Sequence, residues 1–279
     1  MPSAKPTLRC PCDEQFLETR SDFIYDARPP GEVRYELPAP YRREYRHCTL
    51  CRHWFSKHDY DFAAFYNGAY VDASYGDGLR RAFERIMALP RDRSDNYHRV
   101  ERIADFAKRM VVEGRARRLL DVGSGLAVFP ALMKKRGWNC TALDPDPRAV
   151  DHAKEVVGVE ARLGDFMTVA PASLGQFDLI TFNKVLEHVE DPVAMLDASR
   201  KCLLRNGFVY VELPDGEVAS RGGKEREEFF IEHHHVFSCG SLDHMARQAG
   251  FTVVEFERLQ EPSTKFTLRA FLAPAAQSA

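Results

Sequence analysis

A glycine-rich turn and an acidic residue downstream of it could together hold a nucleotide. In the segment 119–129, which reads LLDVGSGLAVF, Gly123, Ser124 and Gly125 follow a short apolar run. Glycines let the backbone of such a turn pass close to a ligand, and the helix that follows offers unpaired N–H groups at its start. Asp144 ends the next apolar run, where a carboxylate can bind both hydroxyl groups of a ribose. The pair predicts a site for an adenosine-bearing ligand.

Asp121 indicates which of two adenosine-containing cofactors the site would bind. It stands two residues before Gly123, and a carboxylate there repels a pyrophosphate but suits a cationic ligand with an ammonium group. A dinucleotide fingerprint also requires a third glycine at the position that Val128 holds. We therefore expect S-adenosylmethionine rather than NAD. The simpler alternative is a tight turn in which Asp121 is only a cap.

Four of the seven cysteines form two close pairs near the N-terminus: Cys10 and Cys12, then Cys48 and Cys51. An odd number of cysteines without a secretion signal indicates thiols or metal ligands rather than disulfides. Two turns that each carry a close pair suit one tetrahedral zinc ion, and four thiolates leave no open position, so the zinc would be structural. His47 or His53 could replace one cysteine, and unliganded thiols are the alternative.

A run of histidines precedes the last predicted helix. Glu232 and His233 stand at its start, and two further histidines follow. Histidine is the side chain best suited to moving a proton near neutral pH, and a neighbouring acid can orient it. We expect His233, oriented by Glu232, to act as a general base, and His188 is the competing candidate. The plain alternative is a polar loop.

Elements able to position these residues follow one another regularly after residue 114. Short apolar runs alternate with helical stretches at 126–136, 146–156 and 192–204, and Asp191 and Ser238 are the expected N-caps of two helices. The apolar runs read RRLLDVG, WNCTALD, VEARLGD, FDLITFN and GFVYVEL, and two more, TVVEFERL and KFTLRAFLA, lie near the C-terminus. Alternation of strand and helix implies parallel pairing with right-handed crossovers. The last two runs predict an antiparallel hairpin.

The first part of the chain is organised differently. Residues 1–60 are rich in proline, arginine and aromatic residues and predict small β-hairpins. Apolar residues at helical spacing then predict one helix at about 77–89 and a second that ends at Gly114. We therefore divide the chain into a zinc-binding lobe over 1–60, a helical connector over 61–113 and an S-adenosylmethionine-binding domain over 114–279.

The composition is that of an ordinary soluble globular protein. The 279 residues include 39 Lys+Arg and 41 Asp+Glu, and 44% are hydrophobic. No run approaches the ~20 apolar residues of a membrane helix, and the N-terminus shows no apolar secretion signal. These features predict a cytoplasmic protein without a membrane partner. The net charge of −2 disfavours a nucleic-acid partner, because phosphate binding usually requires a basic excess.

Five motifs, spread in order over about residues 97–258, resemble those of the class I S-adenosylmethionine-dependent methyltransferases: LLDVGSG, TALDPDP, RLGDF, FDLITFNKVLEHVEDP and LLRNGFVYVELPD. The resemblance implies an α/β, Rossmann-like fold with helices on both faces of a seven-stranded, mostly parallel sheet whose last strand is antiparallel. It also implies a set of cofactor-binding residues. These are Asp121, Gly123 and Gly125 for the methionine part, Asp144 for the ribose, Asp165 and Phe166 for the adenine, and Asn183 and Val185 for the methyl-donor pocket, with Ser124 and Pro145 beside them.

The N-terminal cysteine pairs resemble the zinc lobe of a subgroup of these enzymes that acts on deoxysugar nucleotides and other glycan precursors. That subgroup usually has CxxC in the first pair, where this chain has CPC. In the sugar C-methyltransferase branch a Glu-His pair precedes a Phe-Ser helix start, and Glu232 and His233 resemble it. Three arginines within 41–46 also suit a phosphate group. The resemblance implies methylation of a small molecule, such as a nucleotide-linked sugar, at carbon or oxygen.

Two other functions fit parts of the sequence. One is an RNA or protein methyltransferase, but the N-P-P-[YF] segment that signals amino-group methylation of nucleic acid is replaced by NKVL at 183–186. The other is a non-catalytic adaptor with a zinc lobe and a degenerate cofactor fold. The intact Asp121, Asp144 and Asp165 argue against such degeneracy.

Overall fold

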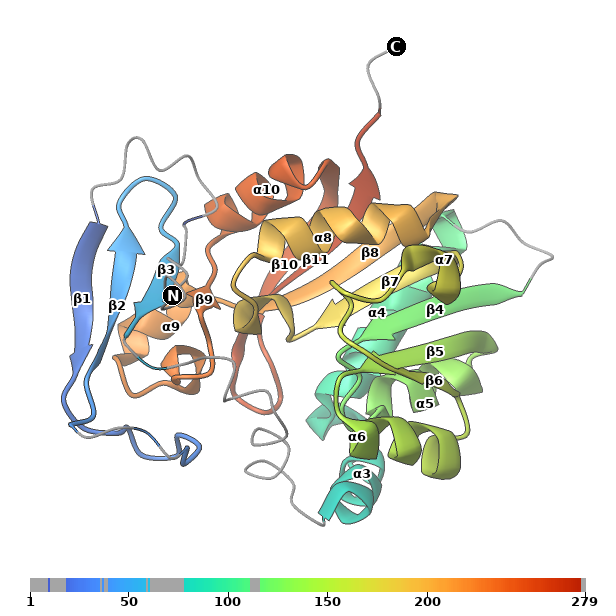
Figure 1. Ribbon diagram of the computed structural model, residues 1–279, viewed down its shortest axis with the longest axis horizontal. Helices are drawn as coiled ribbons and strands as arrows, with labels where there is room; N and C mark the ends of the chain where they lie inside the picture. Colours follow the sequence, from blue (N-terminus) through green and yellow to red (C-terminus); the bar gives the residue numbers. More distant parts are fainter. Residues whose placement is uncertain are drawn as a thin grey trace, which may run out of the picture.

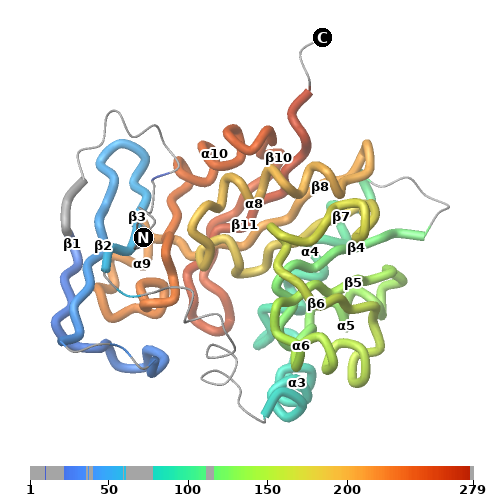
Figure 2. The backbone as a smooth tube through the Cα atoms, viewed as in Figure 1, coloured from blue at the N-terminus to red at the C-terminus, as the bar shows by residue number. Residues whose placement is uncertain are grey.

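The computed structural model describes residues 10, 19–35, 37, 40–58, 60, 78–110 and 116–276. Its strands form two sheets, one of seven strands and one of four. The smaller sheet lies at the left in Figure 1 and the larger one at the centre and right. Figure 2 follows the chain from the small sheet, in blue, into the large one, in green through red.

The seven-stranded sheet has the order β10-β11-β8-β7-β4-β5-β6. Its members are β4 (Arg117–Val122), β5 (Trp138–Asp144), β6 (Glu160–Leu163), β7 (Phe177–Asn183), β8 (Leu203–Pro214), β10 (Phe251–Gln260) and β11 (Phe266–Pro274). The strands from β6 to β8 are parallel, and β11 runs antiparallel to both β8 and β10. The expected sheet and its C-terminal hairpin are both confirmed. The carboxyl ends of β4, β5, β6 and β7 therefore meet at one edge, where sheets of this kind bind ligands.

Helices cover both faces of the large sheet (Figure 1). They are α3 (Leu79–Met87), α4 (Asp95–Met110), α5 (Val128–Lys135), α6 (Pro147–His152), α7 (Pro171–Leu174), α8 (Pro192–Ser199), α9 (Gly216–Ala219) and α10 (Cys239–Gln248). Ile103 of α4 and Met133 of α5 belong to one core cluster, whereas Leu196 of α8 and Met245 of α10 belong to another. Within the described ranges, no helix combines the length and apolar character that crossing a bilayer requires.

Local signals explain where several helices begin and end. The side chains of Asp191 and Ser238 accept hydrogen bonds from first-turn N–H groups of α8 and α10 at 2.8 and 2.9 Å, as the sequence predicts. The helix expected over 146–156 is shorter, because α6 ends at His152 and continues as one π turn, η4 (Ala153–Val157). Single 3₁₀ turns are η3 (Arg91–Arg93), η5 (Leu186–His188), η6 (Arg200–Cys202), η7 (Ser220–Gly222) and η8 (Glu227–Phe229).

The predicted connector over 61–113 is described in part. Its two expected helices correspond to α3 and α4, while 61–77 and 111–113 lie outside the described residues. Phe83 of α3 packs against Leu126 and Val128 near the start of α5, and so joins this region to the large sheet. The boundaries of the three predicted domains remain a prediction.

The small sheet is antiparallel and has the order β1-β2-β3-β9. It consists of β1 (Thr19–Tyr25), β2 (Arg43–Cys48), β3 (Trp54–Lys57) and β9 (His235–Val236). Three strands come from the first 60 residues, but the fourth comes from the histidine run. Tyr45 and Trp54 pack against Phe229 in the core of this sheet. The N-terminal hairpins therefore depend on a distant part of the chain for their packing.

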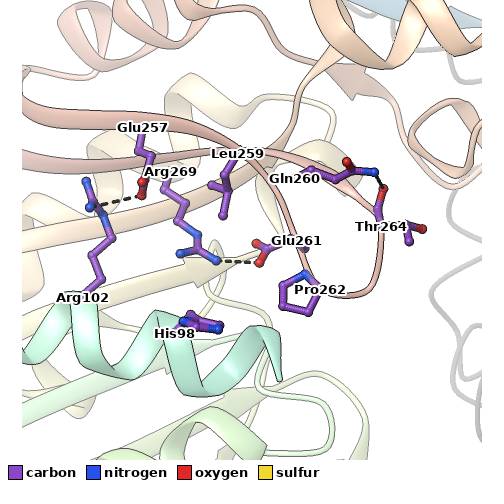
Figure 3. A pocket seen from close by; sticks show the side chains of 9 residues that line it. All are labelled: His98, Arg102, Glu257, Leu259, Gln260, Glu261, Pro262, Thr264 and Arg269. Atoms are coloured by element: carbon purple, nitrogen blue, oxygen red, sulfur yellow. Dashed lines mark hydrogen bonds and ion pairs between the residues drawn. The ribbon is translucent and has the colours of Figure 1, made fainter. Parts of the chain in front are cut away.

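A buried ionic network holds α4 against the sheet beside the ligand-binding edge. Glu212 of β8 pairs with Arg99 of α4 and, at 3.1 Å, with Nε of Arg269 of β11. Arg269 in turn donates from Nη2 to Oε2 of Glu261 at 2.6 Å. Figure 3 shows the Arg269–Glu261 pair beside His98 of α4, at the wall of a cavity of about 640 Å³. Because Glu212 lies in register with Asn183, the network fixes the neighbourhood of the β7 carboxyl end.

We expect Glu212 to make the free energy of unfolding depend on pH below about 5. Burial acts to raise the pKa of Glu212, but Arg99 and Arg269 outweigh it and lower the pKa to about 2. A carboxyl with a depressed pKa contributes stability that is present above its unfolded pKa of about 4.3 and is lost as the pH falls toward 2. The free energy of unfolding of Glu212→Gln, measured with urea at several pH values, should therefore fall less steeply below pH 5 than that of the wild type.

The same variant should also be less stable at pH 7, by up to about 3 kcal/mol, because two buried arginines lose their partner. Glu257→Gln is the matched control, since Glu257 lines the cavity beside this network but pairs with Arg102 at 3.1 Å and has a side chain that is 42% exposed. Equal acid profiles for the wild type and Glu212→Gln would contradict the network's role.

Candidate active site

The turn after β4 brings the ends of β4 and β7 into contact. Gly123 and Gly125 both adopt left-handed backbone, with φ of +67° and +48°. A Cβ on Gly123 would lie 2.8 Å from Cγ2 of Val185, which is closer than side chains tolerate. The two segments therefore approach each other only because Gly123 has no side chain. Ser124 supports the turn by donating from Oγ to the carbonyl of Asp121 at 2.8 Å.

The carboxylate of Asp144 faces this turn from the end of β5. Its Oδ2 accepts from the N–H of Gly125 at 2.8 Å, and its Oδ1 accepts from the N–H of Asp146 at 2.9 Å. Each carboxylate oxygen has two lone pairs, so one on each remains for a ligand's hydroxyl group. Burial raises the pKa of Asp144. Pro145 is exposed between the two acids, and Asp146 caps α6.

Asp121 and Asn183 form one hydrogen-bonded unit between β4 and β7. Oδ1 of Asp121 accepts from Oγ1 of Thr181 at 2.6 Å and from Nδ2 of Asn183 at 2.8 Å. Burial raises the pKa of Asp121 to about 6 despite these bonds. Oδ1 of Asn183 is buried and has no hydrogen-bond partner among the described residues. A buried acceptor of this kind suits a donor on a ligand, such as an ammonium group.

The residues predicted to hold an adenine lie beyond β6. Asp165 accepts from the N–H of Met167 through Oδ1 at 2.8 Å, which orders the turn. Phe166 is buried in the core and its ring packs edge-on against Phe182 with centroids 5.7 Å apart. Leu163 and Met167, which the sequence reasoning missed, expose 57% and 46% of their surface beside it. Large exposed apolar side chains next to a ligand edge are better placed to cover a flat ring than the buried Phe166.

The rings of His188 and His233 contact each other near the carboxyl end of β7. Their ring centroids are 4.8 Å apart with planes at 69°. Nδ1 of His188 lies 2.9 Å from the carbonyl oxygen of Glu232, and Nδ1 of His233 lies 2.9 Å from that of Glu228. A carbonyl only accepts, so both Nδ1 atoms donate and both Nε2 atoms carry a lone pair. Burial lowers the pKa of His188 to about 4 and that of His233 well below its ordinary value, so both rings are neutral at pH 7.

These histidines line a cavity of about 140 Å³ that the sequence reasoning anticipated only in part. Its walls are formed by Lys184, Glu187, His188, Pro214, Glu227, Glu228, Phe230, Glu232, His233, Lys265 and Phe266. Burial raises the pKa of Glu187 and of Glu232 to about 7 in each case. Glu232 was expected here, but Glu187 was not, although its place directly before His188 is a signal that could have found it. The orientation of His233 comes from the carbonyl of Glu228, which no sequence pattern marks.

Three of the four expected metal ligands cluster at the edge of the small sheet. The sulfur atoms of Cys10, Cys48 and Cys51 are buried and lie within 4.8 Å of one another. The Sγ atoms of Cys10 and Cys51 are 3.2 Å apart, and Sγ of Cys48 accepts from the N–H of Cys51 at 3.5 Å. Cys12 lies outside the described residues. Three convergent thiols fit a tetrahedral zinc ion with one further ligand.

The histidines considered as replacement ligands point elsewhere. His53 uses both ring nitrogens, with Nδ1 3.1 Å from Oγ of Ser241 and Nε2 2.9 Å from Nδ1 of His235. His47 stacks on Trp54, and its Nδ1 lies 3.4 Å from a carboxylate oxygen of Asp22. Cys12 therefore remains the better candidate for the fourth ligand.

Two of the three arginines expected to suit a phosphate already bind carboxylates. Arg43 is buried, pairs with Glu32 at 2.6 Å and lies 3.7 Å above the ring of Tyr25. Arg46 pairs with Glu44 at 2.9 Å. A phosphate at this strand would have to displace a buried ion pair, which is costly.

A family model for a methyltransferase domain matches residues 90–256 of the chain. The ubiquinone biosynthesis O-methyltransferase of Xanthomonas oryzae pv. oryzae is 32% identical over 99 residues, which cover 34% of this chain and 41% of that protein. The chain thus matches about two fifths of the length of the Xanthomonas enzyme. The enzyme of the same name from Acinetobacter baumannii is 28% identical over 174 residues, covering 57% of this chain and 72% of the relative.

Among solved structures, the fold is similar to that of the 1,6-didemethyltoxoflavin-N1-methyltransferase of Burkholderia thailandensis. That crystal structure contains 1,6-didemethyltoxoflavin and S-adenosylhomocysteine. The TM-score is 0.58 at 18% identity, and the match covers 82% of this chain and 98% of the other. At this level of identity the likeness shows the fold, and it agrees with the Rossmann-like sheet expected from the sequence.

We expect Gly123→Ala to lower the midpoint of thermal unfolding more than Gly125→Ala does. Both substitutions force a side chain into left-handed backbone, at about 1–2 kcal/mol each. Only the first also drives a Cβ against Val185, and such overpacking costs about 1–3 kcal/mol more, whereas Gly125 faces open space. Circular dichroism during heating measures both variants. The double variant Gly123→Ala, Val185→Ala should recover most of the difference, and simple additivity of the two losses would disprove the contact.

Proposed function

The chain belongs to the methyltransferase-domain family, and on this premise we propose that it transfers a methyl group from S-adenosylmethionine to a small-molecule acceptor. The observation that carries the proposal is the buried Oδ1 of Asn183, which lies beside Asp121 at the carboxyl end of β7 and has no hydrogen-bond partner in the described part of the chain. This pair offers an acceptor and a carboxylate to a cationic amino-acid moiety. A pyrophosphate would be repelled by the carboxylate of Asp121.

The other cofactor contacts follow from the same edge of the sheet. We assign the ribose hydroxyls to Asp144, whose oxygens keep lone pairs after binding the turn. Gly123, Ser124 and Gly125 let the methionine part pass, and Val185 lies against Gly123 at the methyl-donor pocket. The adenine lies near Asp165, and Leu163 and Met167 are its proposed apolar cover.

We propose that the acceptor binds in the cavity lined by His188 and His233. Lys184, which lines this cavity, directly follows Asn183, the residue that we propose lines the methyl-donor pocket. A hydroxyl group, or a carbon beside a keto group, must lose a proton to attack the methyl carbon. The neutral rings of both histidines are compatible with that task, and the assignment of His233 as general base, with Glu232 beside it, stays a prediction.

Small-molecule methylation is favoured over the two alternatives. The relatives named for ubiquinone biosynthesis and the toxoflavin methyltransferase are proteins whose names refer to small molecules. An RNA or protein acceptor lacks such support. A non-catalytic adaptor would have no reason to retain Asp121, Asp144 and Asn183 in one connected arrangement. The nucleotide-linked sugar remains a hypothesis, and the pairing of Arg43 with Glu32 weakens one of its arguments.

A structural zinc ion is the second part of the proposal. Cys10, Cys48 and Cys51 would hold it together with Cys12, and the ion would close the turn between β2 and β3. Such an ion has no open position for substrate, so its task is to order the small sheet. The carbonyl of Cys51 accepts a hydrogen bond from Oγ of Ser238, the cap of α10, and so the site is also joined to the large domain.

We expect the full chain to bind S-adenosylmethionine with a micromolar dissociation constant, equivalent to ~6–8 kcal/mol, and Asp144→Ala to weaken binding more than about tenfold. The variant removes the charged partner of the ribose hydroxyls. Isothermal titration calorimetry with S-adenosylmethionine and its demethylated product measures both constants. Asp151→Ala, an exposed acid on α6, is the matched control and should bind like the wild type. Tight binding of NAD without binding of S-adenosylmethionine would overturn the proposal.

One zinc ion per chain should survive dialysis and be lost in the double variant Cys48→Ser, Cys51→Ser. Without the metal the small lobe buries too little core to stay folded, so limited proteolysis should remove roughly the first 60 residues and leave the later domain intact. Metal analysis and proteolysis of Cys239→Ser provide the control, because Cys239 lies outside the cluster. Freshly purified protein without zinc would rule the site out.

A further inference from the structure

We propose that Glu187, His188 and His233 bind a divalent transition-metal cation, and that this cation also holds a hydroxyl group of the acceptor. One carboxylate oxygen and one ring nitrogen of each histidine lie within 4.8 Å of one another. Ligands about 2.1 Å from an ion are at most about 4.2 Å apart, so shifts of less than about an ångström close the site. The part concerning the acceptor rests on the proposed methyl transfer, whereas the metal site does not.

The two histidines are held in the tautomer that a metal requires. The carbonyls of Glu228 and Glu232 accept from the Nδ1 atoms, which leaves the lone pair of each ring on Nε2. Metal-binding histidines commonly donate their other N–H to a carbonyl or carboxylate in this way, which fixes the ring and raises its basicity. Both carbonyls belong to the same short segment, so the two rings are positioned together.

The third ligand is a carboxylate whose oxygens have no hydrogen-bond partner among the described residues, although the ammonium group of Lys184 is near enough to lower its pKa. Glu187 is fully buried, and neither of its side-chain oxygens has a hydrogen bond. A buried carboxylate without a partner is costly, and a cation between it and the two rings would remove that cost. The backbone of Glu187 is fixed independently, because its carbonyl accepts from the N–H of His234 at 2.7 Å. The hydrogen bond between His234 and Glu187 therefore fixes both the histidine run and the backbone that bears the carboxylate.

The charges around the cavity favour a cation. Four carboxylates line it against two ammonium groups, those of Lys184 and Lys265. Glu228 pairs with Arg226, and Glu227 lies 3.6 Å from Lys265, so these charges are matched. Lys184 donates to Oγ1 of Thr267 at 2.6 Å. Of the charged groups that line the cavity, this leaves two carboxyl groups, those of Glu187 and Glu232, against the one ammonium group of Lys184.

Three protein ligands leave open positions on the ion, and the donor set suggests what fills them. Two histidines and one carboxylate suit Mn²⁺, Fe²⁺, Co²⁺ or Zn²⁺ rather than Ca²⁺. An acceptor hydroxyl in an open position loses its proton to solvent more readily, and its oxygen then attacks the methyl carbon as the C–S bond breaks and its electron pair returns to sulfur. The substrate class is accordingly an alcohol or phenol. The ion would occupy Nε2 of His233, so it would replace that residue as general base.

Mn²⁺ is the probe for this site, because the thiolates of the cysteine cluster prefer zinc. The full chain, loaded with zinc, is titrated with Mn²⁺ alone while electron paramagnetic resonance follows the signal of the free ion. We expect one Mn²⁺ per chain, with affinity at least about tenfold weaker in Glu187→Gln and in His233→Ala. Glu190→Gln is the matched control, since Glu190 is an exposed acid three residues away. It should bind Mn²⁺ like the wild type.

Pulsed resonance on the wild type provides a readout that does not depend on any variant folding. Nitrogen coupling from directly bound imidazole should appear and should change when the histidines are labelled with ¹⁵N. Absence of that coupling, or equal Mn²⁺ binding by Glu187→Gln and the wild type, would overturn the metal site. S-adenosylmethionine calorimetry on the same samples separates the two proposals, because the cofactor can bind without Mn²⁺. Failure of cofactor binding alone would count against methyl transfer and leave the metal site standing.

Discussion

The backbone of residues 230–238 is buried between two sheets, and its polar groups must find partners on both sides. The carbonyls of Phe230 and His233 accept from the hydroxyl of Tyr45, and that of His234 accepts from the N–H of Ser56, all in the small sheet. From the large domain, the carbonyls of Glu187 and Pro214 accept from His234 and Phe237. An unpaired buried N–H or C=O costs about as much as a lost hydrogen bond, so this segment has little freedom to move.

The candidate acceptor pocket follows from that constraint. Because the segment is fixed on both sides, the carbonyl of Glu232 stands where it accepts from His188, and His233 donates to the carbonyl of Glu228, two residues before the segment. The small sheet thus helps to hold the histidines in place. The cysteine cluster contacts the same segment, because Oγ of Ser238 donates to the carbonyl of Cys51. His53 and His235 make a second link, with both rings buried and neutral because burial lowers their pKa values. A metal that orders the small sheet would therefore act on the pocket without touching the acceptor.

The sequence predicted what depends on neighbours along the chain and missed what depends on long-range contacts. Strand periodicity, the turn at Gly123 and the caps Asp191 and Ser238 are local, and the structure places them as expected. The pairing of β9 with β3 joins residues about 180 apart, which no local pattern marks. Glu187 was overlooked although it stands directly before His188, because its convergence with His233 arises only in the folded chain.

The range of the family match also explains why the cofactor-binding residues are easier to assign than the residues that bind the acceptor. Residues 90–256 include the turn, Asp144 and Asn183, to which we assign the cofactor. The acceptor cavity also uses Lys265 and Phe266, and the support of its histidines comes from Tyr45 and Ser56, all outside the matched range. Since the support of the cavity lies in parts that the relatives need not share, their substrates say little about its occupant. The choice of acceptor must instead follow from this chain's own charges, among them the buried carboxylate of Glu187, whose oxygens have no hydrogen-bond partner among the described residues.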